Sequence, residues 1–406
     1  FEPGAYYSIG TQLIPGYAPA GLANSILTWE TTVSRNLGLD IGLLNNRLLV
    51  TFDVYKNSTR DLLVEVDVPT SSGYTKQVQN VGATTNQGVE IQLNGTPVQT
   101  RNFTWRSNFN ISFNKNRVDR YGKFQDFTLV RSGWGGGNMP ADYIVRVGEP
   151  VGAIYGYVTD GYYTLNDFDY NSGVYTLKTG VPNNASVIST APQPGTLKFK
   201  DISGPDGKPD GVINDYDRTV IGNSQPKFFG GFNQQFTYKN FDLSIFVNFQ
   251  AGNDVYNANK LEFTSGYTPK SNLLAIMNNR WRTIDDQGQV VTDPDALAAL
   301  NANATLWQPL RSASSFYVHS WAVEDGSFLR INNITLGYTF PKKWLSRVKV
   351  NSLRIYATVN NLYVLTSYSG YDPEVNTRRS TPMTPGVDYS AYPRSRAFIA
   401  GINLSL

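Results

Sequence analysis

A run rich in aspartate and glycine is the clearest candidate for a metal site. Residues 206–217 read Asp-Gly-Lys-Pro-Asp-Gly-Val-Ile-Asn-Asp-Tyr-Asp, which is the length of a calcium-binding loop of twelve residues. The ligands would be the side chains of Asp206, Asp210, Asn214 and Asp217 and the carbonyl of Val212, with Gly211 at the sharp turn. Lys208 fits poorly at the third position, and Asp217 is shorter than the usual glutamate. The alternative is a surface turn held by its own side-chain-to-backbone hydrogen bonds.

Other chemistry has little support in the sequence. The chain has no cysteine and one histidine, His319, so disulfides, thiolate metal sites and cysteine nucleophiles are excluded. We expect His319 to be a surface or loop residue. Asp160, Asp167 and Asp169 could be considered as a glycosidase pair, but their spacing fixes no separation between carboxylates. We therefore predict no enzymatic activity. The 35 basic and 32 acidic residues nearly balance, which gives no indication of nucleic-acid binding.

Large aromatic side chains in loops are the candidates for ligand contact. Trp134 lies in a glycine-rich segment, where we expect no local core, and Trp307, Tyr317 and Trp321 flank another long loop. We predict that Trp134, Trp307 and Trp321 bind substrate, since exposed rings could stack on sugar faces or pack beneath a lid. The alternative is that these rings pack loop against loop or form the interfacial girdle of a barrel.

The elements that position these loops are long strands of alternating character. In residues 33–43 apolar side chains occupy one parity and Ser, Asn, Gly and Asp the other. A period of two indicates a β-strand with one apolar face. The pattern predicts nine strands, around residues 33–43, 48–55, 89–94, 103–114, 232–238, 241–250, 334–340, 353–360 and 398–406.

The length of these strands and the asymmetry of their connections favour a membrane barrel. Strands in soluble sheets average about 5–6 residues, whereas a tilted strand that crosses a bilayer needs about ten. Links after Leu43, Thr96, Tyr238 and Phe340 are short and the others are long, as periplasmic turns and extracellular loops are. The fold class is therefore all-β, a transmembrane antiparallel β-barrel. A large soluble β protein is the alternative.

The strand count predicts an incomplete barrel. A hairpin within Tyr143–Thr164 would raise nine strands to eleven, and single-chain bacterial barrels have an even number. We expect the missing strands to precede Phe1. Two short loop helices are also predicted, at Ser271–Trp281 and Asp293–Leu300.

Short motifs from residue 27 onward resemble one family in their order and spacing. They are Leu27–Glu30, Asn45–Leu48, Asp61–Leu63, Gln79–Gly82, Asn86–Glu90, Val147–Pro150, Tyr155–Tyr157, Gly252–Asn257, Glu324–Arg330, Asn333–Tyr338, Asn360–Leu362 and Ser369–Glu374. Together they resemble the C-terminal half of SusC/RagA-like TonB-dependent transporters, the outer-membrane glycan and peptide importers of Bacteroidota. Leu406 departs from the terminal phenylalanine that is common in such barrels.

The resemblance implies an architecture and partners. It implies a 22-stranded barrel in outer-membrane lipid, of which residues 1–406 are the C-terminal 9–11 strands, without the plug domain and TonB box. It further implies a SusD-like lipoprotein lid, coupling to TonB through the N-terminal region, an oligosaccharide or oligopeptide substrate, and a dimer of transporter–lid pairs. A passive or secretion-associated outer-membrane barrel is the first functional alternative. An extracellular β-sandwich that binds glycans is the second.

Overall fold

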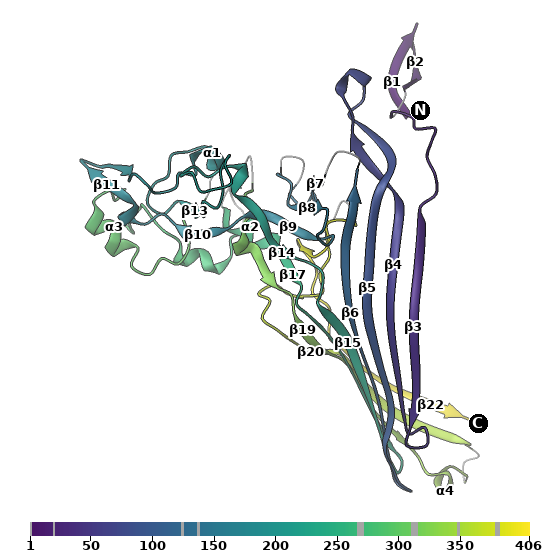
Figure 1. Ribbon diagram of the computed structural model, residues 1–406. Coiled ribbons are helices and arrows are strands. Elements are labelled where there is room, and N and C mark those ends of the chain that lie inside the picture. Colours follow the sequence, from purple (N-terminus) through teal and green to yellow (C-terminus); the bar gives the residue numbers. More distant parts are fainter. Residues whose placement is uncertain are drawn as a thin grey trace.

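The protein consists of a tall curved sheet and a loop assembly that projects from its upper end (Figure 1). The computed structural model describes residues 2–18, 21–122, 126–135, 139–265, 272–309, 316–346, 350–377 and 382–406. The upper end of the sheet carries the long loops, and the lower end carries the short turns.

The sheet contains nine strands, joined in the order β22-β20-β19-β16-β15-β6-β5-β4-β3. Every neighbouring pair is antiparallel. The strands are β3 (Thr31–Leu43), β4 (Leu48–Asp67), β5 (Lys76–Gln99), β6 (Phe103–Tyr121), β15 (Phe228–Tyr238), β16 (Phe241–Ala251), β19 (Phe328–Thr339), β20 (Ser352–Thr366) and β22 (Ala397–Ser405).

This sheet confirms the nine strands predicted from periodicity, and the short turns lie where they were expected. Leu44, Asn45 and Asn46 have positive φ angles of 52°, 58° and 62° in the first turn. One expectation is wrong. The hairpin within Tyr143–Thr164 forms, but its strands belong to a separate sheet of order β14-β9-β8-β7. The reason is local, because these strands are 4 and 5 residues long and lie within the loop assembly.

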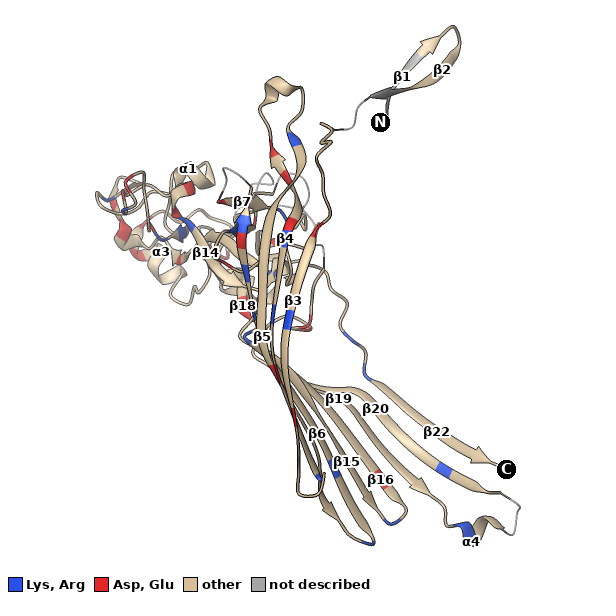
Figure 2. Cartoon of the chain, turned by 45° about the vertical axis from the view of Figure 1, so that its right-hand side comes forward, with Lys and Arg blue, Asp and Glu red and all other residues tan. Residues whose placement is uncertain are grey.

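The two faces of the large sheet differ in chemistry, as the alternation predicts. Leu37, Leu336 and Phe398, on the apolar face, are 75%, 52% and 74% exposed. The buried apolar clusters of the described residues lie instead in the loop assembly and at the upper ends of β4 and β6. A soluble sandwich would bury this face against a second sheet. Charged residues are sparse on the lower parts of the strands (Figure 2), as lipid contact requires.

Aromatic side chains gather near both ends of the apolar face, and Phe109 and Phe232 lie between the two groups. Near the short turns, the ring of Phe236 stacks on those of Phe103 and Trp105 at 6.5 and 5.9 Å. Nearer the loops, the ring of Phe228 lies 5.8 Å from that of Phe113 and 6.3 Å from that of Phe249. We call these sets of residues the lower and upper aromatic girdles. Two aromatic girdles that flank an apolar band are the signature of a barrel in a bilayer.

The loop assembly is built from short elements. Its strands are β7 (Phe127–Val130), β8 (Tyr143–Arg146), β9 (Ala153–Tyr157), β10 (Thr159–Tyr162), β11 (Phe168–Asn171), β12 (Val174–Leu177), β13 (Leu197–Phe199), β14 (Arg218–Asn223), β17 (Asp254–Asn257), β18 (Val323–Asp325) and β21 (Val387–Asp388). The helices are α1 (Ala185–Ile188), α2 (Ala258–Ser265), α3 (Pro294–Leu300) and the 3₁₀ turns η2 (Leu165–Asp167), η3 (Asp215–Asp217), η4 (Ala275–Asn279) and η5 (Ser320–Ala322). Elsewhere lie β1 (Glu2–Ile9), β2 (Gln12–Ala18), η1 (Thr70–Ser72) and α4 (Lys342–Leu345).

The two predicted loop helices are found in different forms. Asp293 caps α3, and its carboxylate accepts a hydrogen bond from Ala296 N at 3.0 Å. The segment before Trp281 forms only the 3₁₀ turn η4, and Ser271, its predicted cap, lies outside the described residues. None of the helices in the described ranges is long and apolar enough to cross a membrane.

A backbone clamp fastens the loop assembly to the sheet. Val118 N, on β6, donates to Glu149 O at 2.8 Å, and Gly148 N donates back to Val118 O at 2.8 Å. Gly148 has a φ angle of 90°, a conformation that glycine adopts at little cost. The Val147–Pro150 motif therefore joins the small sheet to the barrel wall.

The assignment of faces predicts opposite outcomes for neighbouring substitutions on β6. Ile111→Arg places a charge on the apolar face and should reduce the free energy of unfolding by about 2–4 kcal/mol. Asn110→Arg, on the polar face, should change it by less than about 1 kcal/mol. Urea-induced unfolding of the full receptor in lipid vesicles measures both. Equal losses for the two variants would contradict the assignment.

Candidate functional site

The inner face of the sheet is mainly polar, although Phe229 and Phe246 are exposed on it. Asn333 Nδ2 donates to Asn360 Oδ1 at 2.7 Å, and Asn116 Nδ2 donates to Asn86 Oδ1 at 2.8 Å. Arg354 crosses over Gly337 to Asp242, with nitrogen-to-oxygen distances of 2.5 and 3.0 Å. Because these cross-strand pairs satisfy one another, the face can border water or a polar solute without a dry core.

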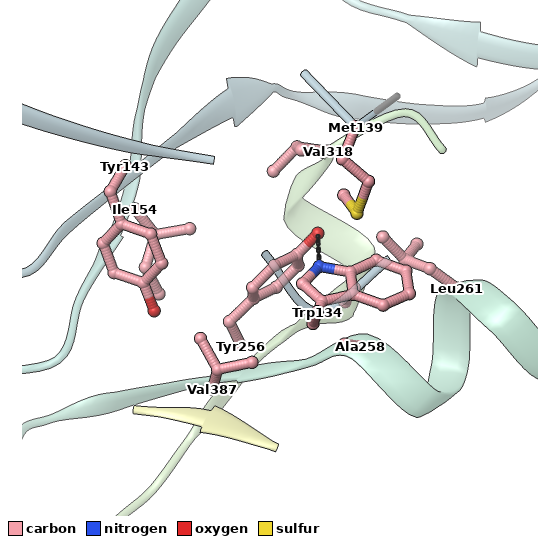
Figure 3. Packing of buried hydrophobic residues seen from close by; sticks show 10 residues of the cluster. Trp134, Met139, Tyr143, Ile154, Tyr256, Ala258, Leu261, Val318 and Val387 are labelled. Atoms are coloured by element: carbon pink, nitrogen blue, oxygen red, sulfur yellow. Dashed lines mark hydrogen bonds between the residues drawn. The ribbon is translucent and has the colours of Figure 1, made fainter. Parts of the chain in front are cut away.

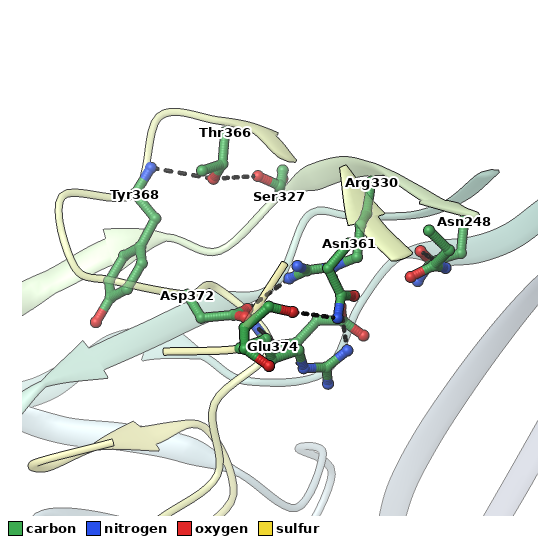
Figure 4. Close-up of polar contacts among 11 residues, drawn as sticks. Asn248, Ser327, Arg330, Asn361, Thr366, Tyr368, Asp372 and Glu374 are labelled. Carbon is green, nitrogen blue, oxygen red and sulfur yellow. Dashed lines mark hydrogen bonds and ion pairs between the residues drawn. The ribbon is translucent and has the colours of Figure 1, made fainter. Parts of the chain in front are cut away.

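A buried ion network holds the last long loop against this inner face. Arg330, on β19, is paired with Asn248 across the sheet, and so lies on the polar side. Its Nη2 donates to Asp372 Oδ1 and its Nε to Glu374 Oε2, both at 2.6 Å (Figure 4). Arg394 reaches the same carboxylates from the exposed side, at 3.7 and 3.1 Å. The network fixes the loop at the mouth of the barrel.

The first aromatic candidate, Trp134, is the centre of a core. It is 3% exposed, and its ring lies 4.8, 5.4 and 6.2 Å from those of Phe316, Tyr389 and Tyr256. Its indole N–H donates to the Tyr256 hydroxyl at 3.3 Å (Figure 3). The expectation of an exposed ring without a local core is therefore wrong. The partners come from distant loops, which is why the glycine-rich surroundings of Trp134 gave no indication of them.

Trp307 and Trp321 meet in a second cluster, around the single histidine. Trp307 is 5% exposed, Trp321 is partly exposed, and their rings lie 4.9 Å apart in an edge-to-face arrangement. His319 is 2% exposed, so a surface position is wrong, whereas the expected alternative of a loop position holds, because the residue lies just before η5 and outside the named strands. Its Nδ1 lies 2.8 Å from the Thr159 hydroxyl. Burial, together with the charge of Lys260, lowers the pKa of His319 to about 3, so the ring is neutral at physiological pH.

Beside these cores lies a cavity of about 380 Å³ with both signs of charge at its rim. Arg218 is nearly buried; its guanidinium lies 4.7 Å over the Tyr155 ring and 4.0 Å from the exposed carboxylate of Asp215. The Tyr157 hydroxyl donates to Asp215 Oδ1 at 3.4 Å. Burial and then the Asp215 charge raise the pKa of Tyr157. The phenol therefore stays protonated and can act as a hydrogen-bond donor.

A neighbouring cavity of about 520 Å³ is lined by Trp281, Thr196, Gln308 and Tyr317. The Trp281 indole N–H is buried and has no hydrogen-bond partner among the residues that the structure describes. Gly195, with a φ angle of 86°, leaves room for this ring, since a Cβ there would lie 2.1 Å from Trp281 Cδ1. Tyr317 lines both cavities. Together they form a surface of aromatic rings, hydroxyls and guanidinium groups suited to an oligomeric polar ligand.

Several oxygens of the predicted calcium loop accept hydrogen bonds from the protein itself. Asp217 is fully buried, and its carboxylate accepts hydrogen bonds from the backbone N–H groups of Ile202, Ser203 and Asn214 at 2.8, 3.1 and 2.8 Å. The Val212 carbonyl accepts from Asn214 Nδ2 at 3.2 Å. Gly211 has a φ angle of 84°, as its position in the turn requires. Within the described ranges, no three or more acidic or histidine side chains gather as a metal site. Calcium binding stays a prediction.

Of the carboxylates considered as a glycosidase pair, Asp167 has a structural role and the other two are exposed. Asp167 Oδ2 accepts from Thr164 N at 2.7 Å, and Asp167 Oδ1 accepts from Lys198 Nζ at 3.1 Å. Burial alone would raise the pKa of Asp167, but these hydrogen bonds lower it below its usual value. A general acid needs the opposite shift. Asp160 and Asp169 are exposed on β10 and β11.

Two parts of the site were not found from the sequence. Arg330 lies in one recognised motif, and its partners Asp372 and Glu374 lie in another. The only signal of their contact was that one motif contains an arginine and the other contains two acidic residues. Arg218 and Asp215 had no such signal. Their cavity forms only when segments around residues 140, 157, 215 and 317 pack together.

An antiparallel sheet with an apolar outer face, a polar inner face and long loops at one end defines the wall of an outer-membrane β-barrel. Comparison with known proteins agrees. Residues 1–203 match the family described as TonB dependent receptor-like, beta-barrel. The chain belongs to this family of TonB-dependent receptors.

Individual relatives extend over nearly the whole chain. TonB-dependent receptor P3 of Formosa agariphila is 32% identical over 98% of this chain and 36% of its own length. TonB-dependent receptor SusC of Bacteroides thetaiotaomicron is 28% identical over 94% of this chain and 32% of its own length. The RagAB peptide importer in its open-open state has a similar fold, with a TM-score of 0.71 and 22% identity over 99% of this chain and 37% of that chain. The chain spans about a third of the length of these relatives. The resemblance to SusC- and RagA-like proteins is confirmed.

The ion network predicts unequal effects for its two arginines. Arg330→Met leaves Asp372 and Glu374 without their buried partner and should destabilise the docked loop by about 3–5 kcal/mol. Arg394→Met removes a half-exposed partner and should cost less than about 1 kcal/mol. Hydrogen exchange of the amides of residues 367–377 in the full receptor measures both. Comparable protection in the two variants would contradict the central role of Arg330.

The calcium prediction and the turn alternative differ in measurable ways. If residues 206–217 bind calcium, titration calorimetry of the chelator-treated full receptor should detect binding, and Asp206→Asn and Asp210→Asn should each weaken it by about tenfold or more. If the segment is a hydrogen-bonded turn, no binding is detected. In that case only Asp217→Asn should increase hydrogen exchange of the loop, because Asp217 alone caps three backbone N–H groups.

Proposed function

We propose that this chain is the C-terminal part of the barrel of an active importer of oligomeric nutrients. In this proposal the complete receptor has a 22-stranded barrel, with a plug and a TonB box encoded before Phe1, and a SusD-like lipoprotein covers the loop assembly. The substrate is a glycan or a peptide. Pairing of two transporter–lid units is part of the same proposal. Support comes from the names of the relatives, TonB-dependent receptor SusC and the RagAB peptide importer.

The observation that carries the proposal is the construction of the loop assembly. Preformed cavities lie beside its cores around Trp134 and Trp307, and the loop assembly stands at the upper end of a polar-lined wall. A preformed cavity pays less ordering entropy on binding than mobile loops do. Such a site suits capture of a scarce ligand before transport. A passive pore needs no such cavity, and for this reason we place the passive or secretion-associated barrel second.

The aromatic candidates keep a place in this proposal. Trp134 and Trp307 would act from within the cores by holding the cavity walls, and the partly exposed ring of Trp321 would contact substrate or lid. The polar ligand contacts would come from Asp215, Arg218 and the Tyr157 hydroxyl. We also propose that the receptor transports its substrate and does not catalyse a reaction on it.

A test uses the full receptor in cells and follows depletion of glycan and peptide mixtures by mass spectrometry. We expect uptake to require the TonB box, and Asp215→Ala to weaken ligand binding by about fivefold to tenfold, as loss of one charged hydrogen bond does. Asp169→Ala, an exposed carboxylate outside the cavity, is the matched control. Uptake that persists without the TonB box would support the passive barrel. Equal effects of Asp215→Ala and Asp169→Ala would contradict ligand binding in the cavity.

A further inference from the structure

A groove of about 800 Å³ crosses the wall at β3, β4, β5 and β6, just below the point where the loop assembly joins β6 at Val118. Its floor, lower wall and upper wall each take one residue from every strand. The floor is Asn36, Tyr55, Gly88 and Asn114; the lower wall is Leu37, Val54, Val89 and Phe113; the upper wall is Arg35, Lys56, Gln87 and Lys115, with Lys227 alongside.

The groove opens on the outer, lipid-facing side of the sheet. Side chains alternate between faces along a strand, so the wall residues share the face of Leu37 and Phe113, while the floor residues direct their side chains inward. On the inner side the Tyr55 ring lies across Gly88, where a Cβ would be 2.5 Å from its hydroxyl oxygen, and donates to Asn114 Oδ1 at 2.9 Å. The lumen side is therefore closed by side chains at this height.

The strand register gathers the basic residues into one row. Arg35 pairs with Lys56, Lys56 with Gln87, and Gln87 with Lys115. Neighbouring strands lie about 4.8 Å apart, so the three cations fall within about 15 Å. All three are exposed, no aspartate or glutamate lines the groove, and within the described part of the chain they form no ion pair. The row is an uncompensated cationic strip.

The height of this row coincides with the boundary of the bilayer. Phe113, in the lower wall of the groove, belongs to the upper aromatic girdle. The lower aromatic girdle begins at Phe103. The two residues are about ten positions apart on β6, which is the length of strand that crosses the hydrocarbon. The cationic row lies two residues further along each strand toward the loops, at Lys115 on β6 compared with Phe113. Lipid headgroups occupy this level on the extracellular side.

We propose that the groove binds the phosphate-bearing headgroup of an outer-leaflet lipid. Arg35, Lys56 and Lys115 hold the phosphate oxygens, Gln87 donates a further hydrogen bond, and the acyl chains descend along Leu37, Val54 and Val89. Charge complementarity and the adjoining apolar row argue together for a lipid. A free anion would use the cations and leave the apolar wall unoccupied. The site is independent of the importer's substrate, since it opens away from the lumen.

The test measures binding of a fluorescent phosphatidic acid to the full receptor in dodecyl maltoside micelles, with phosphatidylcholine of the same chain length as the comparison. The wild type should prefer phosphatidic acid. Arg35→Gln, Lys56→Gln and Lys115→Gln in combination should weaken this binding by on the order of 100-fold, about fivefold for each cation near the membrane surface. The combination Arg35→Lys, Lys56→Arg and Lys115→Arg, which keeps the charge, should retain most of it.

A control removes the same charge elsewhere. Lys178→Gln, Lys200→Gln and Lys208→Gln, on exposed positions of the loop assembly, should leave binding unchanged. Equal binding of both lipids, or equal loss in the two glutamine triples, would overturn the proposal. Complete displacement of the lipid by millimolar inorganic phosphate would show a free-anion site and would also overturn it. Circular dichroism of each triple variant establishes that the barrel has folded.

Discussion

The hydrogen-bond ladder that joins nine strands, with register shifts at a few positions, is the constraint on which the rest of the structure depends. A backbone N–H or C=O that faces hydrocarbon has no water to pair with, so it must form its hydrogen bond with a neighbouring strand. The ladder fixes the register, and the register fixes which side chains face lipid and which face the lumen. Leu37, Leu336 and Phe398 thus stay exposed in the protein itself, because their partner is the membrane. The row formed by Arg35, Lys56 and Lys115 follows from the same register.

Above the membrane another kind of stabilisation operates. The loop assembly has buried cores of its own around Trp134 and Trp307, and it is fastened to the wall by a few polar contacts. Val118 exchanges backbone hydrogen bonds with the Gly148–Glu149 turn, and Arg330 pairs with Asp372 and Glu374. The first contact involves one of the recognised motifs, Val147–Pro150, and the second joins two of them, Glu324–Arg330 and Ser369–Glu374. The motifs therefore mark the joints between wall and loops, while the cavity residues Asp215 and Arg218 lie outside them.

The sequence predicted the wall well but not the packing of the loops, for physical reasons. Strand alternation is a local signal, and a lipid-facing strand displays it over its full length, so all nine strands were placed. Loop packing depends on contacts between distant residues. Trp134 reaches Tyr256 across 122 positions, and no local pattern around Ser132–Gly135 indicates that contact. The hairpin within Tyr143–Thr164 had the right periodicity, but its strands are too short for the wall. For Asp217 the sequence left two roles open, because carboxylates that bind calcium and carboxylates that cap backbone N–H groups occur in the same aspartate-rich turns.

The central claim is that one face of this sheet meets lipid and the other meets an aqueous lumen. Residues 1–406 contain no cysteine, so once any cysteine in the rest of the full receptor has been replaced, single cysteines can be placed along Phe103–Phe113 in lipid vesicles and labelled with a nitroxide. Accessibility to oxygen, which enters the bilayer, and to a water-soluble nickel chelate should then be compared at each position. The structure predicts strict alternation, with oxygen favoured at Phe109, Ile111 and Phe113 and the chelate favoured at Asn108, Asn110 and Ser112. Accessibility without a period of two, or chelate access on the side of Ile111, would contradict the account.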